Sequence, residues 1–254
     1  MGVGTAFALS TLTVAAAHKK TNLRKFPLTH GMLRASAETI AGPRPCDWFD
    51  VFVDDHGSLV ALLMDVHEPA GASAEFLSSL LRETRSLLGE HARLHVVVNE
   101  LELQLATHPG VEVGLIVLRI SQRDAKVELL NAGMPPVANA GPGVRLELYP
   151  ALSGPIGQRV GEVHPYELLP LSWGSTWLAV SDGMLNGAVD AKTVPALCAK
   201  LDLAAQGQAL VAAGSHQLYD TFQRLLTATR FLRDDASGVL VGAYPGTRFQ
   251  SGIV

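Results

Sequence analysis

The sequence predicts an α+β fold in which antiparallel sheets carry helices on their outer faces. Two blocks of strand-like segments are separated by a pair of helical segments, and this grouping is unlike the one-for-one alternation of a parallel, doubly wound sheet. The 254 residues are 48% apolar and 17% charged, so the chain can bury a large core. No internal repeat or low-complexity linker interrupts the pattern, which favours a single domain.

The first block predicts an antiparallel start followed by two helices. Strands are expected at residues 33–40, 49–53 and 59–66, and the His56-Gly57 pair between the last two is typical of a hairpin turn. Apolar residues then recur at helical spacing through residues 72–88 and 94–105, and a His-Pro-Gly sequence ends the second of these segments.

The second block predicts a series of short strands. They are expected at residues 111–120, 126–130, 136–140, 144–148, 162–168 and 176–181, separated by Gly, Pro, Asn and Asp clusters. Residues 193–203 and 208–229 predict two more helices, and residues 238–243 predict a last strand. We therefore expect a domain at residues 33–243, an N-terminal segment at 1–32 of unassigned role and a C-terminal tail at 244–254.

Composition excludes several classes of function. The net charge of −4, with no long basic run, argues against a nucleic-acid partner. Cys46 and Cys198 form no CxxC pair, which argues against a disulfide framework or a zinc site and suits a reducing cytoplasm. The apolar segment at residues 2–17 lacks a preceding positive charge and is shorter than the roughly 20 residues of a spanning helix, so no membrane association is expected. The sequence does not indicate an oligomeric state.

Aspartates recur at the ends of the expected apolar strands. Asp47 precedes one strand, Asp65 ends the next, Asp182 follows a third, and Asp234 and Asp235 precede the last. Each alone fits an ordinary turn, because Asp bonds its own backbone there. Their repeated placement suggests that several carboxylates converge at one end of the fold.

Such convergence calls for cations. Two unit charges about 4 Å apart repel by roughly 4 kcal/mol at an effective dielectric constant of 20. Carboxylates without an accompanying pair of histidines or set of cysteines select hard ions such as Mg²⁺ or Mn²⁺. Two such ions can clamp a phosphoryl group, so hydrolysis of a phosphate ester is the expected chemistry.

Six motifs in order resemble the PPM family of metal-dependent protein serine/threonine phosphatases, in its bacterial SpoIIE-like branch. The resemblance covers residues 33–243 and is carried by CDWFDVF (46–52), LLMDVHEPAG (62–71), NAGMPP (131–136), GPIG (154–157), LAVSDGMLNG (178–187) and DDASGVLVG (234–242). It implies a four-layer α-β-β-α sandwich of two antiparallel sheets, with a metal site in a cleft at one end of the sheets.

The resemblance also implies roles for individual residues. Asp65 would bridge two Mn²⁺ or Mg²⁺ ions with help from the Val66 carbonyl, and Asp182 and Asp234 would ligate the other ion. Asp47 would hold metal-bound water or ligate directly, and a bridging hydroxide would attack phosphorus. The implied substrate is a phosphorylated regulatory protein, of the antagonist type with a STAS domain that controls anti-sigma kinases in bacterial stress signalling.

The sequence departs from the family pattern beside the proposed metals. Pro45-Cys46 replaces a Gly-Gly pair, Met64 replaces a glycine, and residues 67–70 read His-Glu-Pro-Ala where the family has Ser-Gly-His-Gly. Met134 replaces the histidine of the family's Asn-Ala-Gly-His-Pro-Pro. Glycine permits close backbone approach, so these changes should reshape the loop. An alternative is therefore a catalytically weak or inactive pseudophosphatase that binds a partner. A third possibility is a hydrolase of small phosphate esters.

Four lesser candidates lie near the expected site. His67 and Glu68 could add a ligand or carry a proton. Arg44 could contact substrate phosphate. Asp235, beside Asp234, is expected to support a ligand at most.

Overall fold

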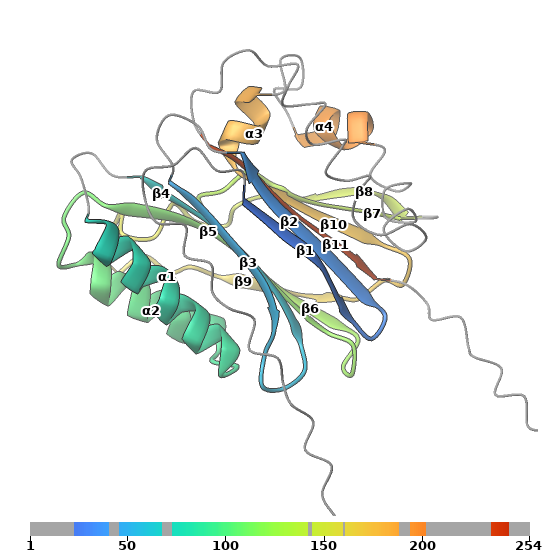
Figure 1. The fold of residues 1–254 in the computed structure, drawn as a ribbon, viewed down its shortest axis with the longest axis horizontal. Helices are drawn as coiled ribbons and strands as arrows, with labels where there is room; N and C mark the ends of the chain where they lie inside the picture. Colours follow the sequence, from blue (N-terminus) through green and yellow to red (C-terminus); the bar gives the residue numbers. More distant parts are fainter. Residues whose placement is uncertain are drawn as a thin grey trace, which may run out of the picture.

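Two antiparallel sheets packed face to face form the centre of the molecule, with helices on both outer sides (Figure 1). The computed structural model describes residues 23–40, 46–67, 73–141, 144–159, 161–187, 194–201 and 235–243. Within these ranges no helix is both long enough and apolar enough to cross a membrane.

Every strand pair in the two sheets is antiparallel. The five-stranded sheet has the order β3 (Asp47–Val53), β4 (Leu59–His67), β5 (Glu112–Ser121), β6 (Lys126–Ala132) and β9 (Tyr166–Pro170). The six-stranded sheet has the order β1 (Leu23–His30), β2 (Leu33–Ile40), β11 (Ala236–Ala243), β10 (Thr176–Val180), β7 (Val137–Gly141) and β8 (Val144–Tyr149).

The helices complete four layers. Leu63 and Trp177 belong to the core between the sheets, whereas Val97 packs between the five-stranded sheet and its helices, and Leu197 packs against the six-stranded sheet. The expected α-β-β-α sandwich is therefore confirmed. The helices on the two sides are α1 (Ala74–Gly89) and α2 (Leu94–Leu105) on one, and α3 (Asp182–Gly187) and α4 (Val194–Leu201) on the other (Figure 1).

Most expected elements are present, and the differences have local causes. The strand expected at 162–168 is displaced and begins at Tyr166, because Glu162 and His164 bond back to the preceding loop: the Gly154 amide donates to Glu162, and His164 Nδ1 lies 2.7 Å from Ser153 Oγ. Strand β1 was not expected; it pairs with β2, so the sheet begins before residue 33. Helix α3 was not expected either. The helix expected at 208–229 lies outside the described residues.

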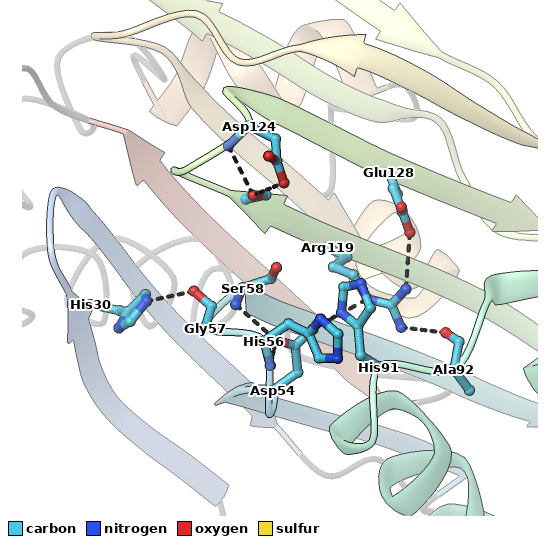
Figure 2. Close-up of polar contacts among 11 residues, drawn as sticks. His30, Asp54, His56, Gly57, Ser58, His91, Ala92, Arg119, Asp124 and Glu128 are labelled. Carbon is cyan, nitrogen blue, oxygen red and sulfur yellow. Dashed lines mark hydrogen bonds and ion pairs between the residues drawn. The ribbon is translucent and has the colours of Figure 1, made fainter.

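A buried polar network lies at the C-terminal end of β3 (Figure 2). The Asp54 carboxylate accepts from the Ser58 amide at 2.8 Å and lies 2.6 Å from His91 Nδ1. The buried Arg119 guanidinium approaches Asp54 and donates to Glu128 at 3.0 Å. Because His91 follows α1, these contacts tie the β3–β4 turn to the segment between α1 and α2.

Candidate metal centre

Strand alternation points Asp47 and Asp65 into the space between the sheets. Leu63 lies in the central core, and successive odd-numbered side chains of a strand share one face, so Asp65 faces the same way. On β3, Val51 also lies in the central core, so the odd-numbered Asp47 points toward the space between the sheets as well. The two aspartates are direct register partners on adjacent strands. The pairing therefore brings two of the expected ligands side by side.

The six-stranded sheet contributes buried polar side chains at the same end. Three of these residues are Thr39, Ser181 and Ser237. They are odd-numbered, like the core residues of β2, β10 and β11, so their side chains point toward the space between the sheets, and all three are buried. The Ser237 amide donates to Ser181 Oγ at 3.0 Å, and the Thr39 and Ser237 hydroxyl oxygens lie 2.5 Å apart. A polar cluster thus replaces the apolar core where the two sheets meet near Asp47.

Asp235 connects the two sheets. One of its carboxylate oxygens accepts from the backbone amides of Cys46 at 2.7 Å and Asp47 at 3.1 Å, and the residue is 1% exposed. The contact fixes the first residues of β3 against the start of β11. Sequence reasoning missed this anchoring role, because the partners lie 188 and 189 positions away along the chain.

Asp47 has the most perturbed electrostatics of the group. Burial raises the pKa of its carboxyl group from 3.8 to about 8, and the nearby Asp65 contributes further to the rise. Hydrogen bonds from Ser181 and Ser237 oppose the rise, and Asp235 adds to it. A shift of this kind is typical of functional sites, where a bound cation can offset the cost of burying a charged carboxylate.

The aspartate pair fits a divalent cation. Asp47 Oδ2 is buried and has no hydrogen-bond partner, which is costly for a carboxylate unless a cation completes its environment. Val66, whose carbonyl oxygen is the next expected metal ligand, directly follows Asp65. Its backbone amide donates a hydrogen bond to the Cys46 carbonyl oxygen at 3.2 Å. Among the described residues no three acidic, histidine or cysteine side chains converge as a complete site. One expected ligand, Asp234, lies outside those residues.

Helix α3 brings Asp182 to the edge of this polar cluster. Asp182 is exposed and is the first residue of α3. A Cβ at Gly183 would overlap the Asp235 carbonyl oxygen, so the start of the helix rests directly on the chain that enters β11. Asp182 therefore lies close to Asp235, the first described residue before β11. Arg44 and Glu68 lie outside the described residues.

Two departures from the family pattern are visible beside Asp65. Met134 stands where the family motif has histidine, and its sulfur occupies the space beside Gly114, the register partner of Asp65. His67 stands where the family has serine, and its Nε2 lies 3.3 Å from Asp65 Oδ2. The altered residues therefore lie against Asp65 itself or against its register partner.

Comparisons with known proteins identify the same fold. A family model described as stage II sporulation protein E (SpoIIE) matches residues 55–243. The chain is similar to the RsbU and RsbW domains of Rv1364c from Mycobacterium tuberculosis, with 20% identity, a TM-score of 0.63, and coverage of 82% of this chain and 60% of that one. It is also similar to the PP2C phosphatase domain and regulatory-domain fragment of SpoIIE from Bacillus subtilis, with 14% identity, a TM-score of 0.64, and coverage of 87% and 65%.

A third solved structure is the catalytic domain of the serine threonine protein phosphatase PstP in complex with two manganese ions. The match has 12% identity, a TM-score of 0.62, and coverage of 84% of this chain and 99% of that one. No match to a curated protein was found. The chain spans less than two thirds of the Rv1364c and SpoIIE structures, and the structural likenesses establish the PP2C-type fold.

Proposed function

Because the chain belongs to the SpoIIE family, and its fold is that of the PPM protein serine/threonine phosphatases, we propose that it hydrolyses phosphoserine and phosphothreonine esters with Mn²⁺ or Mg²⁺. One observation carries the proposal. Asp47 and Asp65 lie side by side at the inter-sheet edge, and one Asp47 oxygen is buried without a partner. Such an arrangement is stabilised by a cation and destabilised without one.

The proposed ligands come from both sheets. Asp47, Asp65 and the Val66 carbonyl would hold one ion, and Asp65, Asp182 and Asp234 would hold the other. Bound Mn²⁺ or Mg²⁺ would acidify water and neutralise charge on the phosphoryl oxygens. The PstP relative with two manganese ions supports this ion count.

The chain's own groups would keep the site rigid. Asp235 holds the first amides of β3, and the Ser181 and Ser237 hydroxyl groups bond the Asp47 carboxylate and fix its orientation. Burial of these groups excludes water and strengthens their interaction with charge at the edge. The site would therefore be preorganised before substrate arrives.

The proposed substrate is a phosphorylated signalling protein. Relatives named for RsbU and SpoIIE support a role in regulation, and we extend this to an antagonist protein of the STAS type. Asp182 is exposed, so a phosphorylated side chain displayed on a protein surface would approach the site from there.

Hydrolysis of a phosphoserine peptide tests the activity. The wild-type protein should release phosphate with Mn²⁺ and not in EDTA, and Asp65→Asn should lower kcat by at least about 100-fold because it removes a bridging ligand. Asp55→Asn is the matched control, since Asp55 is an exposed aspartate in the turn at the other end of the same hairpin. Equal rates for wild type and Asp65→Asn would contradict the proposal.

The alternatives predict different outcomes in the same assay. A pseudophosphatase would release no phosphate with either metal and would still bind the phosphopeptide. A small-ester hydrolase would cleave p-nitrophenyl phosphate with a higher kcat/KM than the phosphopeptide. Either result would contradict the proposed activity and support the corresponding alternative.

A further inference from the structure

His67 continues the line of polar side chains that begins with the two aspartates. It is the last residue of β4 and lies two positions after Asp65, so both side chains leave the strand on the inter-sheet face. The His67 side chain is 47% exposed, whereas that of Asp65 is 5% exposed. The imidazole therefore stands at the mouth of the site, between the buried aspartate pair and solvent.

The two side chains already have the separation of neighbouring ligands. His67 Nε2 lies 3.3 Å from Asp65 Oδ2. Two ligands at right angles around an octahedral ion, each about 2.1 to 2.2 Å from it, are about 3 Å apart. The observed separation is therefore close to that required of two ligands of one ion.

The register partners of Asp65 and His67 on β5 are Gly114 and Glu112. Gly114 presents no side chain of its own, and the Met134 sulfur packs into the space beside it. Glu112 is the register partner of His67 and has the same inter-sheet parity, so it adds negative charge at the mouth. His67 thus has carboxylates on its own strand and on the adjacent one.

We propose that His67 is an additional metal ligand and that it gives the site a preference for Mn²⁺ over Mg²⁺. This inference rests on the proposed function, because it needs the Asp47 and Asp65 cation. The family pattern has serine at this position, so the ligand is a property of this chain.

The preference follows from donor chemistry. Imidazole nitrogen suits first-row transition ions, whereas Mg²⁺ favours oxygen ligands and retains its waters. A nitrogen donor beside two carboxylates therefore adds more free energy to Mn²⁺ binding than to Mg²⁺ binding.

Two measurements on the full chain test the assignment. Calorimetric titration of the metal-free protein should give an Mn²⁺ Kd about tenfold higher in His67→Ser than in wild type, with the Mg²⁺ Kd changed less than about threefold. Electron spin echo modulation of the Mn²⁺-loaded protein should show a directly bound ¹⁴N in wild type and lose it in His67→Ser. His56→Ser is the control, because His56 is an exposed histidine of the same hairpin that stacks on His91.

The outcomes separate this inference from the function on which it rests. Unchanged Mn²⁺ and Mg²⁺ affinities in His67→Ser, or a retained ¹⁴N signal, would overturn the ligand assignment and leave the aspartate site intact. No binding of either ion by the wild-type protein would overturn the site as well. A loss of nitrogen coupling confined to His67→Ser, with His56→Ser unchanged, supports the inference.

Discussion

Asp47 makes the metal-free protein less stable at neutral pH than at acid pH. Burial and the neighbouring Asp65 raise the pKa of Asp47 to about 8 in the folded state, against 3.8 for the free side chain. Between these values the folded state binds a proton that the unfolded state does not bind, so the free energy of unfolding falls as the pH rises. Below about pH 4 both states are protonated and the penalty disappears.

Asp47→Asn should therefore stabilise the metal-free protein in a pH-dependent way. The variant has no charge to bury, so its advantage over wild type should grow from pH 4 to pH 8 and then level off. One unit of pKa shift corresponds to about 1.4 kcal/mol, and with partial exposure of the site we expect about 1 to 3 kcal/mol at pH 8. Urea unfolding in EDTA at several pH values measures this difference in unfolding free energy.

The exposed Asp55 supplies the control for this series. Asp55→Asn should change the free energy of unfolding by less than about 0.5 kcal/mol across the range. A stabilisation by Asp47→Asn that is the same at pH 4 and pH 8 would show that Asp47 does not cause the fall in unfolding free energy with rising pH.

At the scale of elements, the first turn of α3 depends on close contact with the chain entering β11. Gly183 is the second residue of α3, and a Cβ there would overlap the Asp235 carbonyl oxygen. Real side chains do not approach this closely, so the helix and strand would have to separate. The same displacement would move Asp182 away from the other expected ligands.

Gly183→Ala should destabilise the protein and weaken metal binding together. Overpacking of this degree costs at least about 2 kcal/mol of unfolding free energy, and the shift of Asp182 should raise the Mn²⁺ Kd by about tenfold. Urea unfolding and calorimetric titration measure the two effects.

Gly89→Ala is the matched glycine control. A Cβ at Gly89, the last residue of α1, would meet no atom within 4 Å, so the unfolding free energy should stay within about 1 kcal/mol of wild type. Wild-type stability in Gly183→Ala would contradict the close contact between α3 and β11.

At the scale of the whole molecule, the proposed ions would join the two sheets. Asp47 and Asp65 belong to the five-stranded sheet, whereas Asp182 follows β10 of the six-stranded sheet. Ions bound by aspartates from both sheets would add a cross-link between the sheets, beside the contact that Asp235 already makes. Metal binding should therefore stabilise the fold as well as provide the chemistry.

Mn²⁺ should raise the midpoint of thermal unfolding in a concentration-dependent way. A ligand that binds only the folded state adds about 2.7 kcal/mol at a concentration 100 times its Kd. Scanning calorimetry with increasing Mn²⁺ should show this rise in wild type and not in Asp65→Asn. A rise of equal size in both proteins would place the stabilising ion elsewhere.

Local patterns in the sequence predicted much of the fold. The helix expected at 94–105 and the strand expected at 33–40 match α2 and β2, because apolar residues recur at helical spacing in the first and alternate weakly in the second. Strand β1 has no clear alternation, and α3 is too short for a period to show. The start of β9 was misplaced because side chains of Glu162 and His164 hold a loop, which periodicity does not report.

The candidate site was predictable as a set of residue types. Six ordered motifs indicated the family, which the SpoIIE model confirms, and repeated aspartates at strand ends indicated the residue types of a metal site. The ligand roles of Asp47, Asp65, Val66, Asp182 and Asp234 remain proposals. The buried, partnerless oxygen of Asp47 could not be anticipated, since it depends on what packs around it.

The sequence by itself determined the α+β class, the order of its elements and the aspartates available to bind metal, because these follow from local composition and spacing. Only the tertiary structure decided that Asp47 lies beside Asp65, that Asp235 fastens β3 to β11, and that His67 reaches Asp65. Strand register and side-chain burial set these relations. They join residues as far as 189 positions apart, beyond the range of any local pattern.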